Sequence, residues 1–171
     1  MKSEPPVGVP FQNMRNTMGT WQFYGWEQAA VPVRTEEYPG IRTPRDLYDR
    51  LSDGVWCVET CAPRLRGKWS EENRTCGQCS ITAFLAQDIF GGEVRGILLP
   101  DGNYHCYNVV DGCAFDLTSE QFAGEVLCYR DNPQQQRAVH FAKEEKRLRY
   151  ELLKARLLEV CRKAVRPGPE A

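Results

Sequence analysis

The chain has 171 residues, a net charge of −1, and 42% hydrophobic and 26% charged residues, which are ordinary proportions for a globular protein. This length fits one domain with a substantial core. No run reaches the ~20 apolar residues of a membrane span, and the N-terminus lacks the basic-then-apolar order of a signal peptide. We therefore expect a cytoplasmic protein with neither a membrane nor a nucleic-acid partner.

Residues 1–40 show little periodicity and are interrupted by prolines and glycines, which is typical of irregular structure. This N-terminal arm holds an aromatic cluster that we expect to dock on the rest of the protein: Trp21, Phe23, Tyr24 and Trp26. A single α+β domain is predicted over residues 41–166, followed by a tail at 167–171. Its first helix is expected to begin with Thr43 as N-cap and Pro44 at the first helical position.

The stretch from Thr75 to Gly92 predicts a buried central helix. Its apolar residues recur at the spacing of one helical face and continue onto a second strip, and a helix that is apolar on most sides is a buried one. Cys79 lies where this helix begins, beside unpaired N–H groups and the positive end of the helix dipole. Such a position lowers a thiol pKa from about 8.5 to roughly 3.5–7.5. Cys79 is therefore a candidate nucleophile, with a small buried hydrophobe as the alternative.

Three antiparallel strands are predicted after this helix, joined by a turn and by the two-residue hairpin signal Asp111-Gly112. A short helical turn and a long amphipathic helix follow them. The predicted fold class is α+β, with a buried central helix against an antiparallel β-meander and a long C-terminal helix packed across it. The strands are expected at residues 93–99, 104–110 and 113–117, and the helical segments at 118–122 and 137–165.

The chain contains two histidines, so the search for a base that would activate Cys79 is short. His140 falls in the charged C-terminal helix, where we expect it at the surface, whereas His105 falls on the central strand. The predicted hairpin places His105 and Asp116 on one face of the sheet, as diagonal neighbours about 7–8 Å apart. Asn108 falls on the opposite face. This parity favours a Cys79–His105–Asp116 triad over one that uses Asn108. A hydrogen-bonded strand histidine and a turn cap are the alternatives for His105 and Asp116.

The cysteines allow a second interpretation. Cys57-x3-Cys61 and Cys76-x2-Cys79 have the spacing of a four-thiolate zinc site. Against it, the first pair lacks a glycine-rich knuckle, and Cys79 suits a helix start better. A redox pair of Cys76 and Cys79 is disfavoured because no strand precedes the helix. Without a secretion signal we expect free thiols, and we expect no metal and no other cofactor.

Several of these segments also carry a family resemblance: Gly77–Ala83, Gln87–Glu93, His105–Asn108, Asp116–Thr118 and Gln121-Phe122, with Trp56, Glu59-Thr60 and Arg149–Leu153 around them. They resemble the YunG-like family of uncharacterised bacterial proteins over roughly residues 45–160. The order of Cys, strand His and next-strand Asp is also similar to the transglutaminase-like branch of papain-like folds. That resemblance implies a papain-like core with an acyl-transfer or amide-hydrolysing site at Cys79, His105 and Asp116. It departs at Ser80, where transglutaminases usually have an aromatic residue.

The sequence therefore predicts a cysteine-dependent enzyme that acts on an unknown acyl or amide substrate. Cys79 would attack the carbonyl, His105 would transfer the proton, and Asp116 would orient the imidazole. The backbone N–H of Cys79 would form half of the oxyanion hole. The candidates for its second donor are Gln78, Asn73 and Trp69.

Two alternatives to an enzyme remain from the sequence: a non-catalytic binding or structural domain of the same fold, and a zinc-stabilised four-cysteine domain. A protein partner would bind through the N-terminal arm or the C-terminal helix. Residues 137–166 carry ten Lys and Arg against four Glu, which suits an acidic partner, although a solvated helix face is the more common reason for such a charge run.

Overall fold

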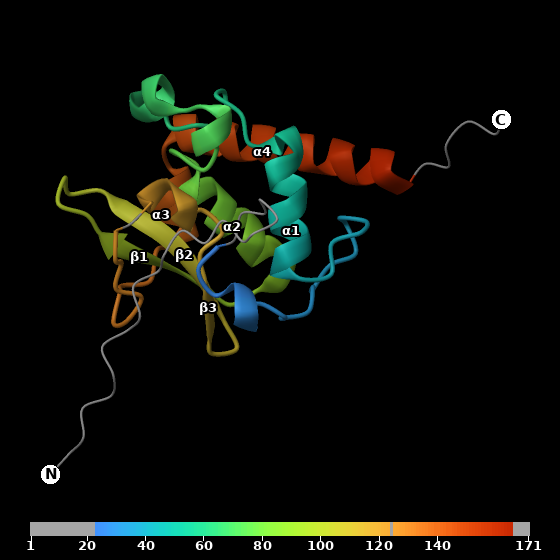
Figure 1. The fold of residues 1–171 in the computed structure, drawn as a ribbon, viewed down its shortest axis with the longest axis horizontal. Coiled ribbons are helices and arrows are strands. Elements are labelled where there is room, and N and C mark those ends of the chain that lie inside the picture. The colour runs from blue at the N-terminus through green and yellow to red at the C-terminus, as the bar shows by residue number, and fades with distance from the viewer. Residues whose placement is uncertain (1–22, 124, 166–171) are drawn as a thin grey trace, which may run out of the picture.

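The computed structural model describes residues 23–123 and 125–165, and it has the mixed α+β class predicted from the sequence. Shorter helical turns connect the main elements, and one wider turn at Leu51–Val55 directly continues the first helix. No helix in the described ranges is long and apolar enough to cross a bilayer. The main elements, shown in Figure 1, are α1 (Pro44–Arg50), α2 (Cys79–Phe90), β1 (Glu93–Leu98), β2 (Tyr104–Val110), β3 (Cys113–Phe115), α3 (Arg137–Phe141) and α4 (Glu144–Val165).

Helix α1 begins as predicted. Thr43 is the N-cap and Pro44 follows it, and a complete capping box joins Thr43 to Asp46. The Asp46 carboxylate accepts the Thr43 N–H at 3.0 Å, so the side chains satisfy groups that a helix start would otherwise leave open. Leu47 and Tyr48 are buried on the inner face of this helix.

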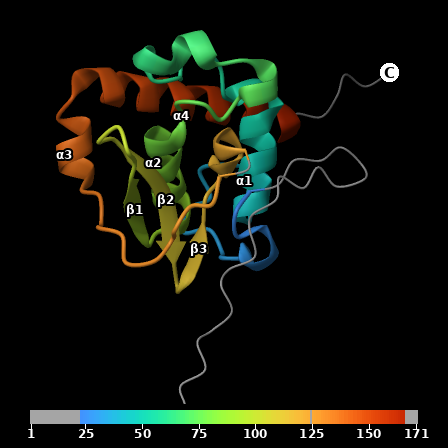
Figure 2. The ribbon, with the colours of Figure 1, turned by 60° about the vertical axis from the view of Figure 1, so that its left-hand side comes forward.

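Helix α2 is the centre of the fold, also as predicted. It packs against β1 and β2 on one side and against α1 and α4 on the others, and Figure 2 shows it enclosed by these elements. Leu85, Ala86 and Ile89 are fully buried. The helix ends at Phe90, where Gly91 adopts a φ of 80° that most other residues disfavour.

The sheet has the order β1-β2-β3, and both strand pairs are antiparallel. Val110 pairs with Cys113 and Asn108 with Phe115, which confirms the register predicted from the two-residue hairpin. Strand β3 ends at Phe115, two residues earlier than predicted. The reason is a turn that begins at Asp116, whose Oδ1 accepts the N–H of Thr118 at 3.1 Å and whose carbonyl accepts the N–H of Ser119 at 3.2 Å. On the outer edge, the N–H of Asp116 donates to the carbonyl of Tyr24 in the N-terminal arm at 3.0 Å.

The predicted long C-terminal helix is confirmed as α4, but its predicted start at residue 137 was wrong, because a break at residues 142–143 separates α3 from α4. Glu144 and Glu145 occupy the first turn of α4, where the helix dipole favours acidic residues. Its buried face comprises Arg149, Leu153, Leu157 and Cys161. The surface position expected for His140 was also wrong. This residue lies half-buried in α3, with its ring centroid 4.9 Å from that of Phe84.

The described part of the N-terminal arm packs into the main core. Phe23, Ala29 and Tyr38 are buried there, and the Phe23 ring lies 5.3 Å from that of Tyr48 on α1. The docking predicted for the aromatic cluster is therefore confirmed for Phe23, while Trp21 lies outside the described residues. A single short turn at Trp26–Gln28 interrupts the irregular course of the arm.

Candidate active site

Cys79 is the first residue of α2 and is partly exposed. In the preceding loop Gly77 has a φ of 70°, and a Cβ at this position would lie 2.5 Å from Cys61 Sγ, so a larger residue would strain the turn. Gln78 is the N-cap residue, and its side chain makes no capping hydrogen bond within the described chain. The first-turn N–H groups therefore stay open to a ligand, and the sulfur of Cys79 lies at the positive end of the helix dipole.

His105 is the second residue of β2 and is almost completely buried, with 1% of its surface exposed. Its Nε2 lies 2.6 Å from Asp116 Oδ2, and the edge of its ring meets the ring of Phe122 at 4.5 Å between centroids. Its Nδ1 is also buried, and no described residue forms a hydrogen bond with it. The imidazole is thus fixed through one nitrogen while the other remains available.

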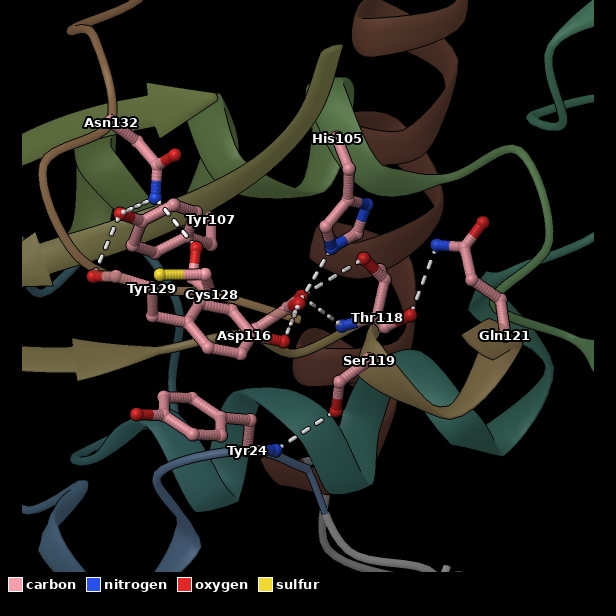
Figure 3. Close-up of polar contacts among 10 residues, drawn as sticks. All are labelled: Tyr24, His105, Tyr107, Asp116, Thr118, Ser119, Gln121, Cys128, Tyr129 and Asn132. Carbon is pink, nitrogen blue, oxygen red and sulfur yellow. Dashed lines mark hydrogen bonds and ion pairs between the residues drawn. The ribbon is translucent and has the colours of Figure 1, made fainter. Parts of the chain in front are cut away.

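Asp116 lies at the centre of a buried hydrogen-bond network (Figure 3). Its Oδ2 accepts the hydroxyl of Tyr129 at 2.7 Å as well as the His105 contact. Its Oδ1 accepts the N–H and the hydroxyl of Thr118 at 3.1 and 3.2 Å. With four hydrogen bonds and 1% exposure, the carboxylate is held in one orientation and oriented toward the imidazole.

A layer of tyrosines closes the site behind Asp116. The ring of Tyr129 stacks on that of Tyr24 at 3.7 Å and 11°, and it meets Tyr107 edge-on at 5.0 Å. Asn132 donates to the Tyr107 hydroxyl at 3.0 Å and to the carbonyl of Cys128 at 2.8 Å, as Figure 3 shows. These contacts exclude water from the acid and fix the segment that carries Tyr129.

The charges of Asp116 and Cys79 act on the pKa of His105, and His105 in turn acts on the pKa of Cys79. Burial alone would lower the pKa of His105, but the Asp116 carboxylate and then the Cys79 thiolate raise it to about 10. For Cys79, a hydrogen bond from the Cys106 thiol outweighs the opposing effect of burial, and the His105 side chain adds to it, so its pKa lies well below the ordinary 9.0. The arrangement therefore favours a thiolate at Cys79 and an imidazolium at His105.

The structure thus brings His105 and Asp116 into direct contact and couples Cys79 to His105, while Asn108 points away. The Asn108 side chain donates to the carbonyl of Ala83 on α2 at 2.8 Å. Sequence reasoning missed Tyr129, Phe122 and Cys106. Tyr129 follows an irregular segment, so its approach to Asp116 has no local signal, whereas the position of Cys106 directly after the candidate base is a signal that could have indicated it.

The three candidates for the second oxyanion donor already bond to backbone carbonyls. Trp69 Nε1 donates to Arg74 at 2.9 Å, Asn73 Nδ2 to Lys68 at 3.4 Å, and Gln78 Nε2 to Cys57 at 2.9 Å. Trp69 has a single N–H and would have to break this bond before it could serve an oxyanion, whereas the Asn73 and Gln78 amides each keep a second N–H.

The four cysteines of the zinc interpretation do not converge. Cys57 interacts with Thr60, and the buried Cys61 lies beside Cys76. Cys79 instead faces His105 and Cys106. In the ranges that the structure covers, no group of three or more His, Cys, Asp or Glu side chains is arranged to hold a metal ion.

Comparison with known proteins gives two matches. The sequence profile of a family described as YunG protein matches residues 43–162, a range that contains all three candidate site residues. A protein of Bacillus subtilis strain 168 named "Uncharacterized protein YunG" is 44% identical over 59 residues, which make up 34% of this chain and 50% of that protein. The chain thus spans about half the length of the curated relative it matches. No solved structure matches the chain.

Proposed function

The chain belongs to the YunG family, and on that premise we propose that it is a cysteine-dependent enzyme that transfers or hydrolyses an acyl group through Cys79. The observation that carries this proposal is the imidazole of His105, which interacts with Cys79 and is fixed by Asp116 through Nε2, while its buried Nδ1 has no hydrogen-bond partner in the described chain. Buried polar atoms are nearly always hydrogen-bonded, so an open ring nitrogen in the core requires an explanation. Proton exchange with a reacting group supplies one.

The proposed mechanism begins with the Cys79 thiolate, whose sulfur forms a bond with the carbonyl carbon of the substrate. The negative charge moves to the carbonyl oxygen, where the open first-turn N–H groups of α2 stabilise it. The His105 imidazolium gives its proton to the leaving nitrogen or oxygen, and an acyl-thioester remains on Cys79. The neutral imidazole then takes a proton from the water or amine that attacks the thioester, and this step restores the thiolate.

Asp116 acts through His105 in this scheme. Its carboxylate holds the imidazole by Nε2–H, so that Nδ1 is the nitrogen that exchanges protons with the substrate. Tyr129 and Thr118 keep that carboxylate in place with three further hydrogen bonds. The same order of a helix-capping Cys, a strand His and an acid after it supports a papain-like, transglutaminase-like core as part of this proposal.

The proposal is tested by alkylating every cysteine over a range of pH and following each site by mass spectrometry. The experiment compares the wild type with His105→Ala, and the matched control is His140→Ala, which removes the other histidine. We expect Cys79 to be alkylated well below the pH at which the remaining thiols react. His105→Ala should abolish this early reactivity, and His140→Ala should leave it unchanged in a protein that is still folded by circular dichroism.

If Cys79 titrates like the other thiols in the wild type, the enzyme proposal fails. A binding or structural domain would then take its place. If the thiolate is present, a panel of activated esters and amides, assayed with and without an added amine, separates hydrolysis from acyl transfer.

A further inference from the structure

Cys106 follows the candidate base directly on β2 and has 5% of its surface exposed. Its side chain lies on the opposite face of the strand from His105, because successive residues of a strand alternate. There it joins a small buried cluster with Ala83 and Phe84 of α2. Ala83 is one helical turn after Cys79 on the same helix face, so the Cys106 thiol packs beneath the first turn of α2.

The backbone of Cys106 also faces the site. In β1 the N–H of Gly96 donates to Pro133 at 3.0 Å and the carbonyl of Val94 accepts from Gln135 at 2.7 Å, so these two residues point away from β2. Their partners on β2, one of which is Cys106, must therefore direct their N–H groups away from β1.

On that other side the neighbouring strand is β3, and its pairing with β2 ends where Phe115 meets Asn108. No backbone carbonyl in the described chain pairs with the Cys106 N–H beyond that point. This side of the strand faces Cys79, and both the side chain and the backbone of Cys106 lower the pKa of the Cys79 thiol.

We propose that Cys106 is a positioning residue that stabilises the nucleophile with two hydrogen bonds, from its thiol and from its backbone N–H, to the sulfur of Cys79. This inference rests on the proposed role of Cys79 as a thiolate. It also gives a physical reason for the early end of β3, since continued pairing would occupy the N–H that now points at the sulfur.

The two thiols share one negative charge, and the surroundings place it on Cys79. The bond between them lowers the pKa of Cys79, and the same bond, with burial, raises the pKa of Cys106 well above 9.0. On the side of Cys79, His105 adds positive charge. On the side of Cys106, Lys146 of α4 favours its thiolate and Asp116 opposes it, and both effects are smaller than the bond itself. Cys106 therefore remains the protonated donor.

The test measures the pH midpoint of Cys79 alkylation in Cys106→Ala and Cys106→Ser, with Cys161→Ala as the control, a buried cysteine of α4. Loss of one hydrogen bond to a charged group predicts a midpoint about one to two pH units higher in Cys106→Ala. Cys106→Ser keeps a donor and should restore most of the wild-type midpoint. Cys161→Ala should leave the midpoint unchanged.

The proposed hydrogen bond from the backbone N–H of Cys106 to the sulfur of Cys79 is tested by a separate measurement. The amide proton of residue 106, followed by ¹H–¹⁵N NMR in the wild type, should titrate with the midpoint of Cys79 and stop titrating in Cys79→Ala. An unchanged midpoint in Cys106→Ala, or an equal shift in the alanine and serine variants, overturns the role of the thiol. A 106 amide that does not respond to the titration overturns the role of the N–H.

His105→Ala separates this inference from the proposed function. A low Cys79 midpoint that depends on Cys106 but not on His105 would support the positioning role and refute the His105 base. A low midpoint that depends on His105 alone would do the reverse. An ordinary midpoint in the wild type refutes both.

Discussion

Replacement of Asp116 by asparagine tests directly whether the charge of this carboxylate maintains the imidazolium at His105 and the thiolate at Cys79. The substitution keeps the shape of the side chain and removes its charge. In the structure this charge is in contact with His105 Nε2 at 2.6 Å, and both side chains are only 1% exposed. Solvent therefore screens the pair weakly, so the loss of the carboxylate charge should lower the pKa of the His105 imidazole by almost the full strength of their interaction.

The magnitude follows from the opposing effects on His105. With Asp116 and Cys79 charged, the pKa of His105 is raised from 6.5 to about 10, against a burial effect that lowers it. Without the carboxylate, burial dominates and the imidazole is neutral at about pH 7. The Cys79 thiolate then loses its cationic partner. We expect its midpoint to rise by about 2 pH units or more, and the alkylation rate below both midpoints to fall ~100-fold.

The assay is the rate of iodoacetamide alkylation at Cys79 in Asp116→Asn and wild type, with the buried Cys61 and Cys76 in the same protein as internal references. Burial raises the pKa of Cys61 to about 11 and also raises that of Cys76, so both should react late in either protein. If Asp116→Asn keeps the wild-type midpoint of Cys79 while remaining folded, the reasoning that links Asp116 to the thiolate through His105 is refuted.

Three further predictions concern the surroundings of the site. Asn108→Ala removes the hydrogen bond to Ala83 and should lower the free energy of unfolding in urea by about 1–3 kcal/mol. The pH midpoint of Cys79 alkylation should not change, and a shifted midpoint would favour Asn108 as the residue that orients His105. Gly77→Ala forces a Cβ to within 2.5 Å of Cys61 Sγ at a φ of 70° and should cost about 1–3 kcal/mol, and a neutral effect in the same urea assay would contradict the strained geometry of this turn. Burial raises the pKa of Glu120 from 4.5 to about 8, so the folded state holds a proton that the unfolded chain releases. The stabilisation from this proton is complete below about pH 4.5 and is lost as the pH rises through about 8. Glu120→Gln should therefore flatten this loss and raise the melting temperature above about pH 8, whereas calorimetric profiles that run parallel for both proteins would exclude the effect.

The predictions from the sequence that the structure confirms depend on local chemistry. The N-cap at Thr43 with Pro44 at the first helical position, the start of the central helix at Cys79, and the hairpin register at Asp111-Gly112 each follow from a few adjacent residues. The hairpin register is by itself sufficient to bring His105 and Asp116 onto one face of the sheet.

The parts that were missed depend on contacts between distant segments. The backbone of Asp116 pairs with Tyr24 of the N-terminal arm, and its carboxylate gains Tyr129 as a partner from an irregular segment. The break between α3 and α4 accompanies the contacts of Arg137, which donates to the carbonyl of Phe84 and to Asp88 on α2. No periodicity or turn signal reports such contacts, so the sequence could not indicate them.

The docking of the N-terminal arm beside Asp116 has a consequence for the order in which the protein folds. The N–H of Tyr24 donates to the hydroxyl of Ser119 at 2.9 Å across 95 residues of chain, and closing a loop of that length costs about 4 kcal/mol of chain entropy. The hairpin of β2 and β3 closes over two residues and incurs almost none of this cost. The sheet that carries His105 can therefore form before the arm arrives, and the layer behind the Asp116 carboxylate is completed only when the ring of Tyr24 stacks on that of Tyr129. Assembly of the thiolate–imidazolium pair would then mark the last stage of folding rather than its nucleus.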